Sequence, residues 1–303
     1  MCLTAPVTRT RTAILARRFY DRFEPVHAVT YFAPEARRAL DDLGYRGFWM
    51  GYFASRSAPL GRVPTEVVTA VFYNFAPARV ARALPDAWQI AGPEQALRAR
   101  QESAVAALHR YGVRDSESVR TAAELAARAA GSAGLDGRPL FAANAALDWP
   151  DDPVARLWHA VTLLREHRGD AHVAVLTAAG ISGRESNVLH AAADRVPAEL
   201  IMRSRDYDDE EWARIQDRLA GRGLLDADGA LTDAGRALKQ HIEDTTDRLA
   251  LAVLDPLTDD EVETLFRTLT PIARAVVAAG DIPAATPLGL NRAELDDDSA
   301  RLA

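Results

Sequence analysis

The sequence predicts a mainly α-helical protein, and three observations lead to this prediction. Apolar residues recur at spacings of three and four along much of the chain, which is the pattern of helices with one buried face. Glycine and proline separate these periodic stretches from one another. Runs typical of β-strands are few. The predicted helices span residues 34–43, 78–88, 93–111, 115–130, 153–167, 171–179, 183–193, 208–221, 232–253 and 258–279.

The ends of these helices carry suitable capping residues. Gly169 fits the left-handed position that follows many helices, and Asp170 fits the N-cap of the next helix. We therefore expect one helix to end before Gly169 and another to begin after it. Thr232 or Asp233 can accept hydrogen bonds from the free amides at the start of the helix that follows.

Two stretches favour β-structure. Residues 67–73 (VVTAVFY) are rich in β-branched and aromatic side chains and follow a Pro-Leu-Gly turn, which indicates a strand. Residues 224–225 and 230–232 flank the sequence Asp-Ala-Asp-Gly, which is typical of a hairpin turn. We expect a small β-hairpin at the second stretch and hairpin-like structure at the first.

An internal repeat indicates how these elements are organised. The string HAVT at residues 27–30 recurs at 159–162, and each copy is followed by helices, a glycine turn and hairpin-like sequence. This is the element order of a winged helix, although short matches also arise by chance in a chain rich in alanine and valine. We predict two winged-helix-like units in pseudo-repeat with small β-hairpin wings. The predicted division is a leader at 1–19, units at 20–137 and 138–280, and an acidic tail at 281–303.

The composition excludes several classes of protein. The chain has a formal net charge of −7, a single cysteine, and one lysine among 36 basic residues. One cysteine permits neither an intramolecular disulfide nor a cysteine zinc cluster, which fits a reducing, cytoplasmic location. No uninterrupted apolar run reaches about 20 residues, so we expect no membrane span. The arginine bias, with abundant alanine, indicates a GC-rich bacterial genome.

Residues 208–249 resemble the recognition helix, wing and following helix of a MarR-type repressor, on the pattern RGLL…LT..G. Such a repressor places this helix in the major groove of DNA and a basic wing on the minor groove. Between Asp206 and Arg248, however, twelve acidic residues oppose six basic ones, and this surface would repel phosphate. We therefore do not expect DNA as a partner. By analogy with MarR-like proteins, we expect a homodimer.

The densest polar cluster lies at residues 165–172 (REHRGDAH). The candidates here are Glu166, His167 and His172 for acid–base catalysis, and Arg165 and Arg168 for ligand binding. His159, His167 and His172 can in principle bind a metal, but no spacing of known specificity is present and no motif requires a cofactor. The alternative is a purely structural corner of helix caps and solvated side chains.

A second cluster lies at residues 24–56 and includes four aromatic side chains between positions 48 and 53. His27 is its candidate catalytic residue, because its ring shares a helix face with Tyr31. The candidate ligand-binding residues are Tyr31, Arg46, Trp49, Tyr52 and Arg56. Glycines beside large aromatics leave room for a cavity with apolar walls. The alternative is a core helix whose arginines extend to solvent.

Five strings relate the chain to a known family. HAVTYFAPE, GFWMGYFASRSAPLG, FAPARVARALPDAW, LLREHRGDAHVA and RGLLDADGALTDAG occur in this order between residues 20 and 290. In this the chain resembles a large actinobacterial helix-turn-helix family, some of whose members are called SalK-like. The family has no established activity. The resemblance implies a bacterial cytosolic protein of winged-helix ancestry and directs attention to the two clusters.

These observations predict a small-molecule site between the two units, closed by residues 165–172. The arginines favour an anionic or aromatic ligand. The protein would act as an acid–base enzyme or as a ligand-sequestering protein of specialised metabolism, and whether it is an enzyme stays open. The alternative is a ligand-responsive MarR-type transcriptional regulator, which would need a contiguous arginine-rich face.

Overall fold

The computed structural model describes residues 11–193, 196–284, 286 and 288–302. Its helices are α1 (Ala13–Phe32), α2 (Pro34–Asp42), α3 (Gly47–Ser57), α4 (Thr65–Val71), α5 (Pro77–Ala83), α6 (Ala87–Ile90), α7 (Pro93–Arg110), α8 (Glu117–Gly131), α9 (Pro139–Ala145), α10 (Pro153–Ala178), α11 (Gly183–Ala192), α12 (Ala198–Arg205), α13 (Asp209–Gly221), α14 (Asp233–Leu251) and α15 (Asp259–Ala278). The chain also forms three short 3₁₀ helices in the described residues, η1 (Ala58–Leu60), η2 (Ala252–Leu254) and η3 (Arg292–Asp296).

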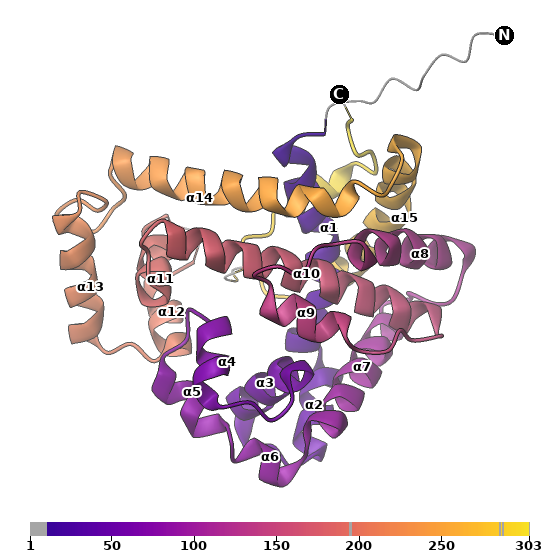
Figure 1. Ribbon diagram of the computed structural model, residues 1–303, viewed down its shortest axis with the longest axis horizontal. Helices are drawn as coiled ribbons and strands as arrows, with labels where there is room; N and C mark the ends of the chain where they lie inside the picture. Colours follow the sequence, from indigo (N-terminus) through magenta and orange to yellow (C-terminus); the bar gives the residue numbers. More distant parts are fainter. Residues whose placement is uncertain (1–10, 194–195, 285, 287, 303) are drawn as a thin grey trace.

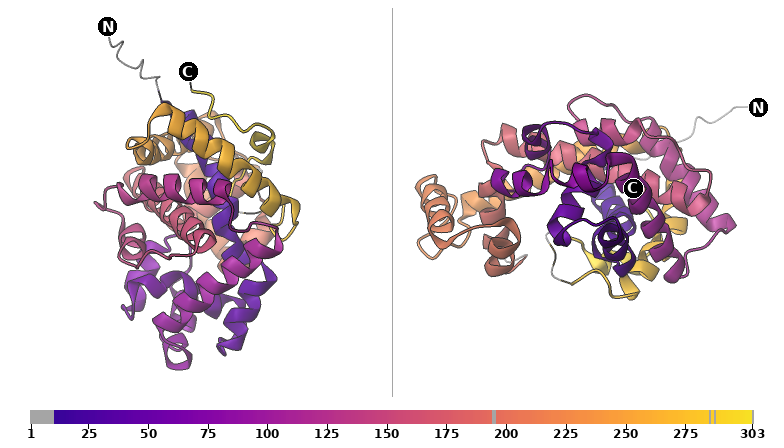
Figure 2. Two further views of the ribbon diagram at one scale, coloured as in Figure 1. Left: turned by 90° about the vertical axis from the view of Figure 1, so that its right-hand side faces the viewer. Right: turned by 90° about the horizontal axis from the view of Figure 1, so that it is seen from below.

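The long helix α10 lies across the middle of the molecule (Figure 1). Helix α14 runs beside it and α1 packs against both. Helices α2 to α6 lie on one side of α10, whereas α11, α12 and α13 gather at its C-terminal end (Figures 1 and 2). Helices α11 and α12 lie close to α4 and α5, and α13 lies on the outside.

Three hydrophobic clusters hold this arrangement together. The first joins α1, α7, α8, α10 and α15, and the second joins α3 to α6. The third joins the end of α10 to α11, α13 and α14. Helix α10 contributes to the first cluster as far as Leu164 and to the third from Val175 onward. The polar stretch at 165–172 therefore lies between two cores, which places its side chains where the two packed regions meet.

The prediction of a mainly α-helical fold is confirmed, but the predicted β-hairpin wings are wrong. No strand or sheet forms in the described part of the chain. Residues 67–73, expected to be a strand, fall mostly in α4, which begins after Pro64 at its N-cap. Val68 and Val71 are buried on one face of this helix, in the second cluster. Burial of this face outweighs the weak β-preference of the valines.

The second predicted wing is a closed loop with a single isolated antiparallel bridge, between Leu225 and Leu231. The Asp226 side chain accepts the backbone N–H groups of Asp228 and Ala230, at 3.0 and 2.9 Å. The two segments that flank this turn cannot form a longer β-ladder, because Thr232 already caps α14 by accepting the Gly235 N–H at 3.0 Å. The two predicted winged-helix-like units therefore both lack a β-hairpin.

The predicted helix break at Gly169 is also wrong, because α10 continues without interruption to Ala178. A glycine inside a helix costs about 1 kcal/mol relative to alanine, which packing on both ends of α10 offsets. Asp170 does not cap its own helix; it accepts the Phe141 N–H at 2.9 Å, at the start of α9. The continuous helix aligns Arg165, Arg168, Gly169 and His172 on one side of α10.

The described C-terminal segment packs along α1. The first ten residues of the predicted leader lie outside the described residues, and α1 begins at Ala13. Part of the predicted acidic tail packs on α1, where Arg22 Nη2 donates to the carbonyls of Glu294 and Asp297 at 3.0 and 2.6 Å. The predicted boundary at residue 137 falls between α8 and α9, which both pack on α10.

Candidate functional site

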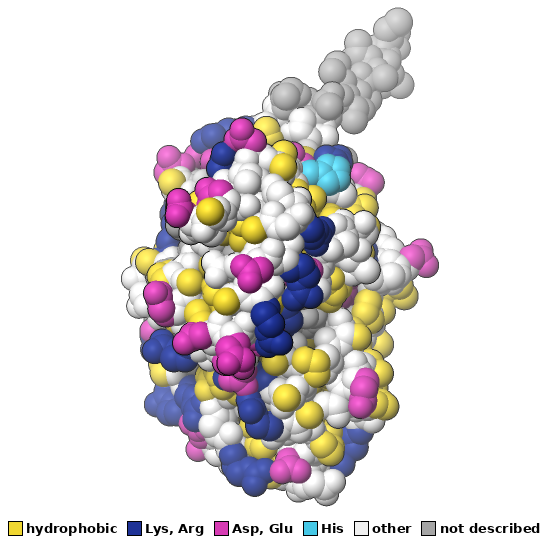
Figure 3. Space-filling model, turned by 90° about the vertical axis from the view of Figure 1, so that its left-hand side faces the viewer, with side chains coloured by type: hydrophobic (Ala, Val, Ile, Leu, Met, Phe, Trp, Pro, Cys, Tyr) yellow, Lys and Arg dark blue, Asp and Glu magenta, His cyan; other side chains and the backbone are white. Residues whose placement is uncertain are grey.

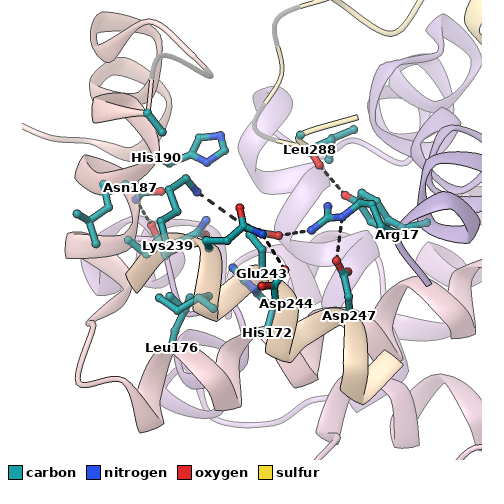
Figure 4. A pocket seen from close by; sticks show the side chains of 18 of the residues that line it. Arg17, His172, Leu176, Asn187, His190, Lys239, Glu243, Asp244, Asp247 and Leu288 are labelled. Carbon is teal, nitrogen blue, oxygen red and sulfur yellow. Dashed lines mark hydrogen bonds and ion pairs between the residues drawn. The ribbon is translucent and has the colours of Figure 1, made fainter. Parts of the chain in front are cut away.

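A cleft of about 980 Å³ opens between α1 and the C-terminal helices. Asn187 and His190 on α11 form one side of it and Arg17 on α1 the other, with Glu243 of α14 between them (Figure 4). Side chains of α10 and α12 and the segment 288–291 complete the lining. The continuous α10 contributes the face that carries Arg165 and His172.

The charge of this lining differs in sign from that of the chain. Its described cations are Arg17, Arg165, Arg168, Arg205, Arg236 and Lys239, and its described carboxylates are Glu243, Asp244 and Asp247. Six cations therefore face three carboxylates in the cleft, although the whole chain carries −7. The lining side chains thus have a formal excess of three cations, part of which Glu166 and Asp233, outside the lining, offset.

Behind Arg165, a buried ion-pair network lies at the inner side of the cleft. Glu166 is fully buried and accepts from Arg56 Nε and Nη2 at 3.2 and 3.1 Å and from Arg165 Nη1 at 2.7 Å. Burial alone would raise the pKa of Glu166, but the guanidinium groups of Arg165 and Arg56 outweigh it and hold that pKa far below its usual value. Glu166 is therefore an anion at neutral pH.

Glu24 on α1 also belongs to this network, but its protonation differs from that of Glu166. Its side chain is fully buried, and neither carboxyl oxygen has a hydrogen-bond partner among the described residues. Arg165 Nε lies 3.8 Å from its Oε1. Burial raises the pKa of Glu24 to about 7, against the opposing effect of Arg165. Glu24 thus exchanges a proton near neutral pH, a range suited to general acid–base chemistry.

The Glu24→Gln variant is expected to show what this pKa means for stability. The folded-state pKa of about 7 lies above the usual 4.5, so wild-type stability falls as pH rises from about 4.5 through 7. Glutamine mimics the protonated acid, so the variant should match the wild type at pH 4.5 and exceed it by about 1–3 kcal/mol at pH 8. Urea unfolding at both pH values measures this; a difference independent of pH would contradict the assignment.

Two aromatic rings and a histidine extend the network away from Glu166. His27 bonds to Thr162 Oγ1 through Nδ1 and to Tyr31 Oη through Nε2, each at 3.0 Å. Its burial, together with nearby Arg165, holds its pKa well below the usual 6.5. The Tyr31 ring lies 5.3 Å from that of Tyr52, whose hydroxyl accepts from Arg56 Nη1 at 3.3 Å.

The structure thus brings six of the predicted site residues together. These are His27, Tyr31, Tyr52, Arg56, Arg165 and Glu166. Two further predicted residues, Arg168 and His172, line the cleft itself. Arg168 Nη2 donates to Asp247 at 2.8 Å, and His172 bonds to Thr246 Oγ1 at 3.0 Å. Burial lowers the pKa of His172 to about 4, so this ring is neutral at pH 7.

Three predicted residues lie outside this hydrogen-bonded network, although the Trp49 ring packs 5.6 Å from that of Tyr52. His167 follows Glu166 directly, so it points about 100° away around the helix, where its ring packs 5.1 Å from that of Phe141. Arg46 is exposed and pairs with Asp86 at 2.7 Å. Trp49 lies under the guanidinium of Arg79, 4.3 Å from its ring centroid.

The histidines considered for a metal site do not gather. The ring of His159 packs 4.7 Å from that of Trp149, while His167 and His172 lie on different sides of α10. Among the described residues, no group of three histidine, cysteine, aspartate or glutamate side chains is arranged to hold a metal ion.

Sequence reasoning missed several lining residues. Arg17 and Tyr20 line the cleft. Together with the buried Glu24, they belong to the same stripe on α1 as His27 and Tyr31, at spacings of three and four that place all five on one helix face. That polar stripe in a buried helix was the available signal. Lining residues on α12 and α14 gave none, because nothing local distinguishes them from surface side chains.

Helix α11 uses its polar side chains within the molecule. Arg184 donates to both carboxylate oxygens of Glu211 at 2.8 and 2.7 Å and stacks on Tyr207. Asn187 is buried and donates to the Asn74 carbonyl and to the Tyr207 hydroxyl, each at 2.9 Å. In this conformation α11 therefore has neither side chain available for a nucleic acid.

Helix α13 presents a mixed charge to solvent. Arg214, Arg218 and Arg222 are exposed at four-residue spacing along it, while acidic side chains occupy its first turn. Figure 3 views the molecule from the end where α13 lies and shows a short row of basic side chains with acidic ones close beside it. This face is not uniformly acidic, although the acids surround the row.

Comparison with known proteins shows the wider relationship. None of the described helices is long and apolar enough to cross a lipid bilayer. Neither a curated protein nor a solved structure matches the chain. A family model described as a helix-turn-helix family matches residues 16–283, from the first turn of α1 to beyond the end of α15. Since the match covers most of the sequence, the protein belongs to this helix-turn-helix family.

Proposed function

We propose that the protein binds a small organic anion in the cleft between α1, α10, α11, α12 and α14. One observation carries the proposal: six cations face three carboxylates in this lining, in a chain of net charge −7. Inside a cleft, charges interact more strongly than in bulk water. An excess of guanidinium groups there favours carboxylate or similar anions as partners.

The size and mixed chemistry of the cleft support the same proposal. A volume of about 980 Å³ lies at the upper end of the range common for small-molecule sites. Apolar lining comes from Leu176, Leu189, Ile201, Leu231, Ile242 and Leu288. These side chains suit the hydrophobic body of a ligand, aromatic or polyketide-like, whose anionic group meets an arginine.

Two modes of action follow from this proposal and stay alternatives. As an enzyme, the protein would use the neutral His172, which lines the cleft, for proton transfer. As a ligand-sequestering protein, it would hold the molecule without turnover. Either activity agrees with the SalK-like motifs and with a role in specialised metabolism.

An anionic fluorescent dye, 8-anilinonaphthalene-1-sulfonate, tests the proposal. We expect saturable binding of one dye per chain, with enhanced emission. Ala192→Trp should abolish this binding, since Ala192 lines the cleft and an indole would fill it. Ala213→Trp places the same ring on the exposed face of α13 and serves as the matched control. Equal binding to both variants would place the dye outside the cleft and contradict the proposal.

A second candidate is a ligand-responsive DNA-binding regulator. The exposed row Arg214, Arg218 and Arg222 on α13 favours it, because phosphate contacts need clustered cations. The test is a mobility shift on the protein's own promoter at low salt. Binding that weakens with salt and is lost in Arg218→Ala would support this function. No shift at 50 mM salt would exclude this row as a DNA-binding surface.

A further inference from the structure

We propose that Arg205 is the anion-binding residue of the cleft and that its ligand is an organic anion with a hydrophobic ring system. The inference rests on the proposed function and deepens it, since it assigns the charged contact to one side chain of α12. Arg205 lines the cleft and contacts no carboxylate among the described residues.

The arginines on the opposite wall are already compensated. Arg17 pairs with Glu243 and with Asp247, the latter at 3.1 Å. Arg168 shares Asp247 at 2.8 Å, and Arg165 contacts Glu166 at 2.7 Å. An incoming anion would have to compete with a protein carboxylate at each of these positions. At Arg205 no carboxylate of the described residues would compete with it.

Among the described residues, the Arg205 guanidinium has no ion-pair partner and only weak hydrogen bonding. Its Nε is buried without a hydrogen bond, and Nη1 has only a long contact of 3.5 Å to the Ser204 carbonyl. One face of the guanidinium covers the Phe75 ring, 4.2 Å from the centroid. Burial lowers the pKa of Arg205, and the nearby cations Arg79 and Arg56 lower it further. Burying an unpaired cation is unfavourable, so an anion bound here would relieve that cost.

The acid next to Arg205 in the chain does not supply the missing charge. Asp206 adopts a left-handed backbone conformation, with φ of 55°, and its carboxylate pairs with Arg79 and Arg82 of α5. The backbone at this point is held by Arg184, which donates to the carbonyls of Arg205 and Asp206 at 2.6 and 3.1 Å. These hydrogen bonds fix the backbone at Arg205, and the Asp206 carboxylate is directed toward the arginines of α5 and not toward Arg205.

The neighbouring lining describes the rest of the ligand. Asn74 and Ser204 add polar groups to the cleft wall, while Leu189 and Ile201 add apolar surface. A wall of this kind accepts one charged group attached to a hydrophobic ring system, not a small hydrated ion.

Two dyes that differ in a single charged group test the inference. 8-Anilinonaphthalene-1-sulfonate carries a sulfonate, and N-phenyl-1-naphthylamine is the same ring system without it. The wild type should bind the sulfonate at least tenfold more tightly. Arg205→Gln should weaken sulfonate binding at least tenfold and change binding of the neutral dye less than twofold. Arg203→Gln removes an exposed arginine of the same helix and should behave as the wild type.

The outcomes separate this inference from the proposed function. If the wild type binds neither dye, both are wrong. If it binds the two dyes equally, or if Arg205→Gln leaves the ratio of their affinities unchanged, the cleft is still a ligand-binding site but Arg205 is not its anion-binding residue. Retained binding of the neutral dye confirms that the variant cleft is folded. If Arg205→Gln does not fold, Arg205→Met can replace it, because methionine keeps an aliphatic chain on Phe75. The preference of the wild type for the sulfonate dye over the neutral dye still tests whether the cleft selects an anion.

Discussion

Replacing Glu166 by glutamine is expected to lower the free energy of unfolding by about 3–5 kcal/mol. Glutamine keeps the shape of the side chain and removes its charge. The guanidinium groups of Arg56 and Arg165, now bound to Glu166 at 3.1 and 2.7 Å, would then lose this anion, and Arg165 would keep only the more distant Glu24 carboxyl group at 3.8 Å. The cost is mainly that of the uncompensated cations, not of the lost hydrogen bonds. Urea unfolding at pH 7 measures the difference.

The effect of Glu166→Gln should depend on pH in a defined direction. The folded-state pKa of Glu166 lies far below the usual 4.5, so its contribution to stability is present above about pH 4.5 and is lost as pH falls. The difference between wild type and variant should therefore narrow below pH 4.5. The control is Asp86→Asn, which removes the exposed partner of Arg46 and should cost less than about 1 kcal/mol. Similar losses from both variants would show that the buried network is not needed for stability.

Gly183→Ala is expected to separate α11 from the N-terminal helices. A Cβ at this position would lie 1.8 Å from the Tyr73 carbonyl oxygen and 3.0 Å from the Asn74 Cα. These are backbone atoms, so no side-chain rotation relieves the overlap. The Tyr73 hydroxyl bond to the Ile181 carbonyl, now 2.6 Å, and the Asn187 bond to Asn74 would be lost together. Overlap of this kind destabilises by about 1–3 kcal/mol or more.

Thermal unfolding and limited proteolysis test the Gly183→Ala prediction. We expect a lower Tm and faster cleavage between α10 and α13, because α11 loses its contact with the loop before α5. Gly131→Ala is the matched control, since a Cβ there meets nothing within 4 Å. An unchanged Tm and cleavage pattern in Gly183→Ala would show that α11 does not depend on this contact. Since Asn74 and Asn187 also line the cleft, dye binding should weaken in the same variant.

Much of the site was predictable where local spacing decides direction. The four-residue spacing of His27 and Tyr31 on a helix correctly placed this pair on one face. The contact between Tyr52 and Arg56 was not predicted, although the two residues have the same spacing. The two pairs meet at Glu166 because of the way α1, α3 and α10 cross. Local sequence spacing does not determine how helices cross. The side chain of His167, adjacent to Glu166 in the chain, points to another side of α10 and packs against Phe141.

The sequence by itself determined the helical content and most helix positions, because apolar periodicity and capping residues act within a few residues. Tertiary packing decided the rest. It carried α10 through Gly169, since burial at both ends of the helix outweighs one glycine. It reduced the expected wing to a single bridge between Leu225 and Leu231, since α14 begins directly after it.

Tertiary structure also decided where charge is left unpaired. The sequence shows an excess of acid overall and next to Arg205, yet Asp206 pairs with α5 and Arg205 faces the cleft. Whether a charge is compensated depends on which side chains lie within a few ångströms of it. That proximity is set by the fold and not by nearness along the chain.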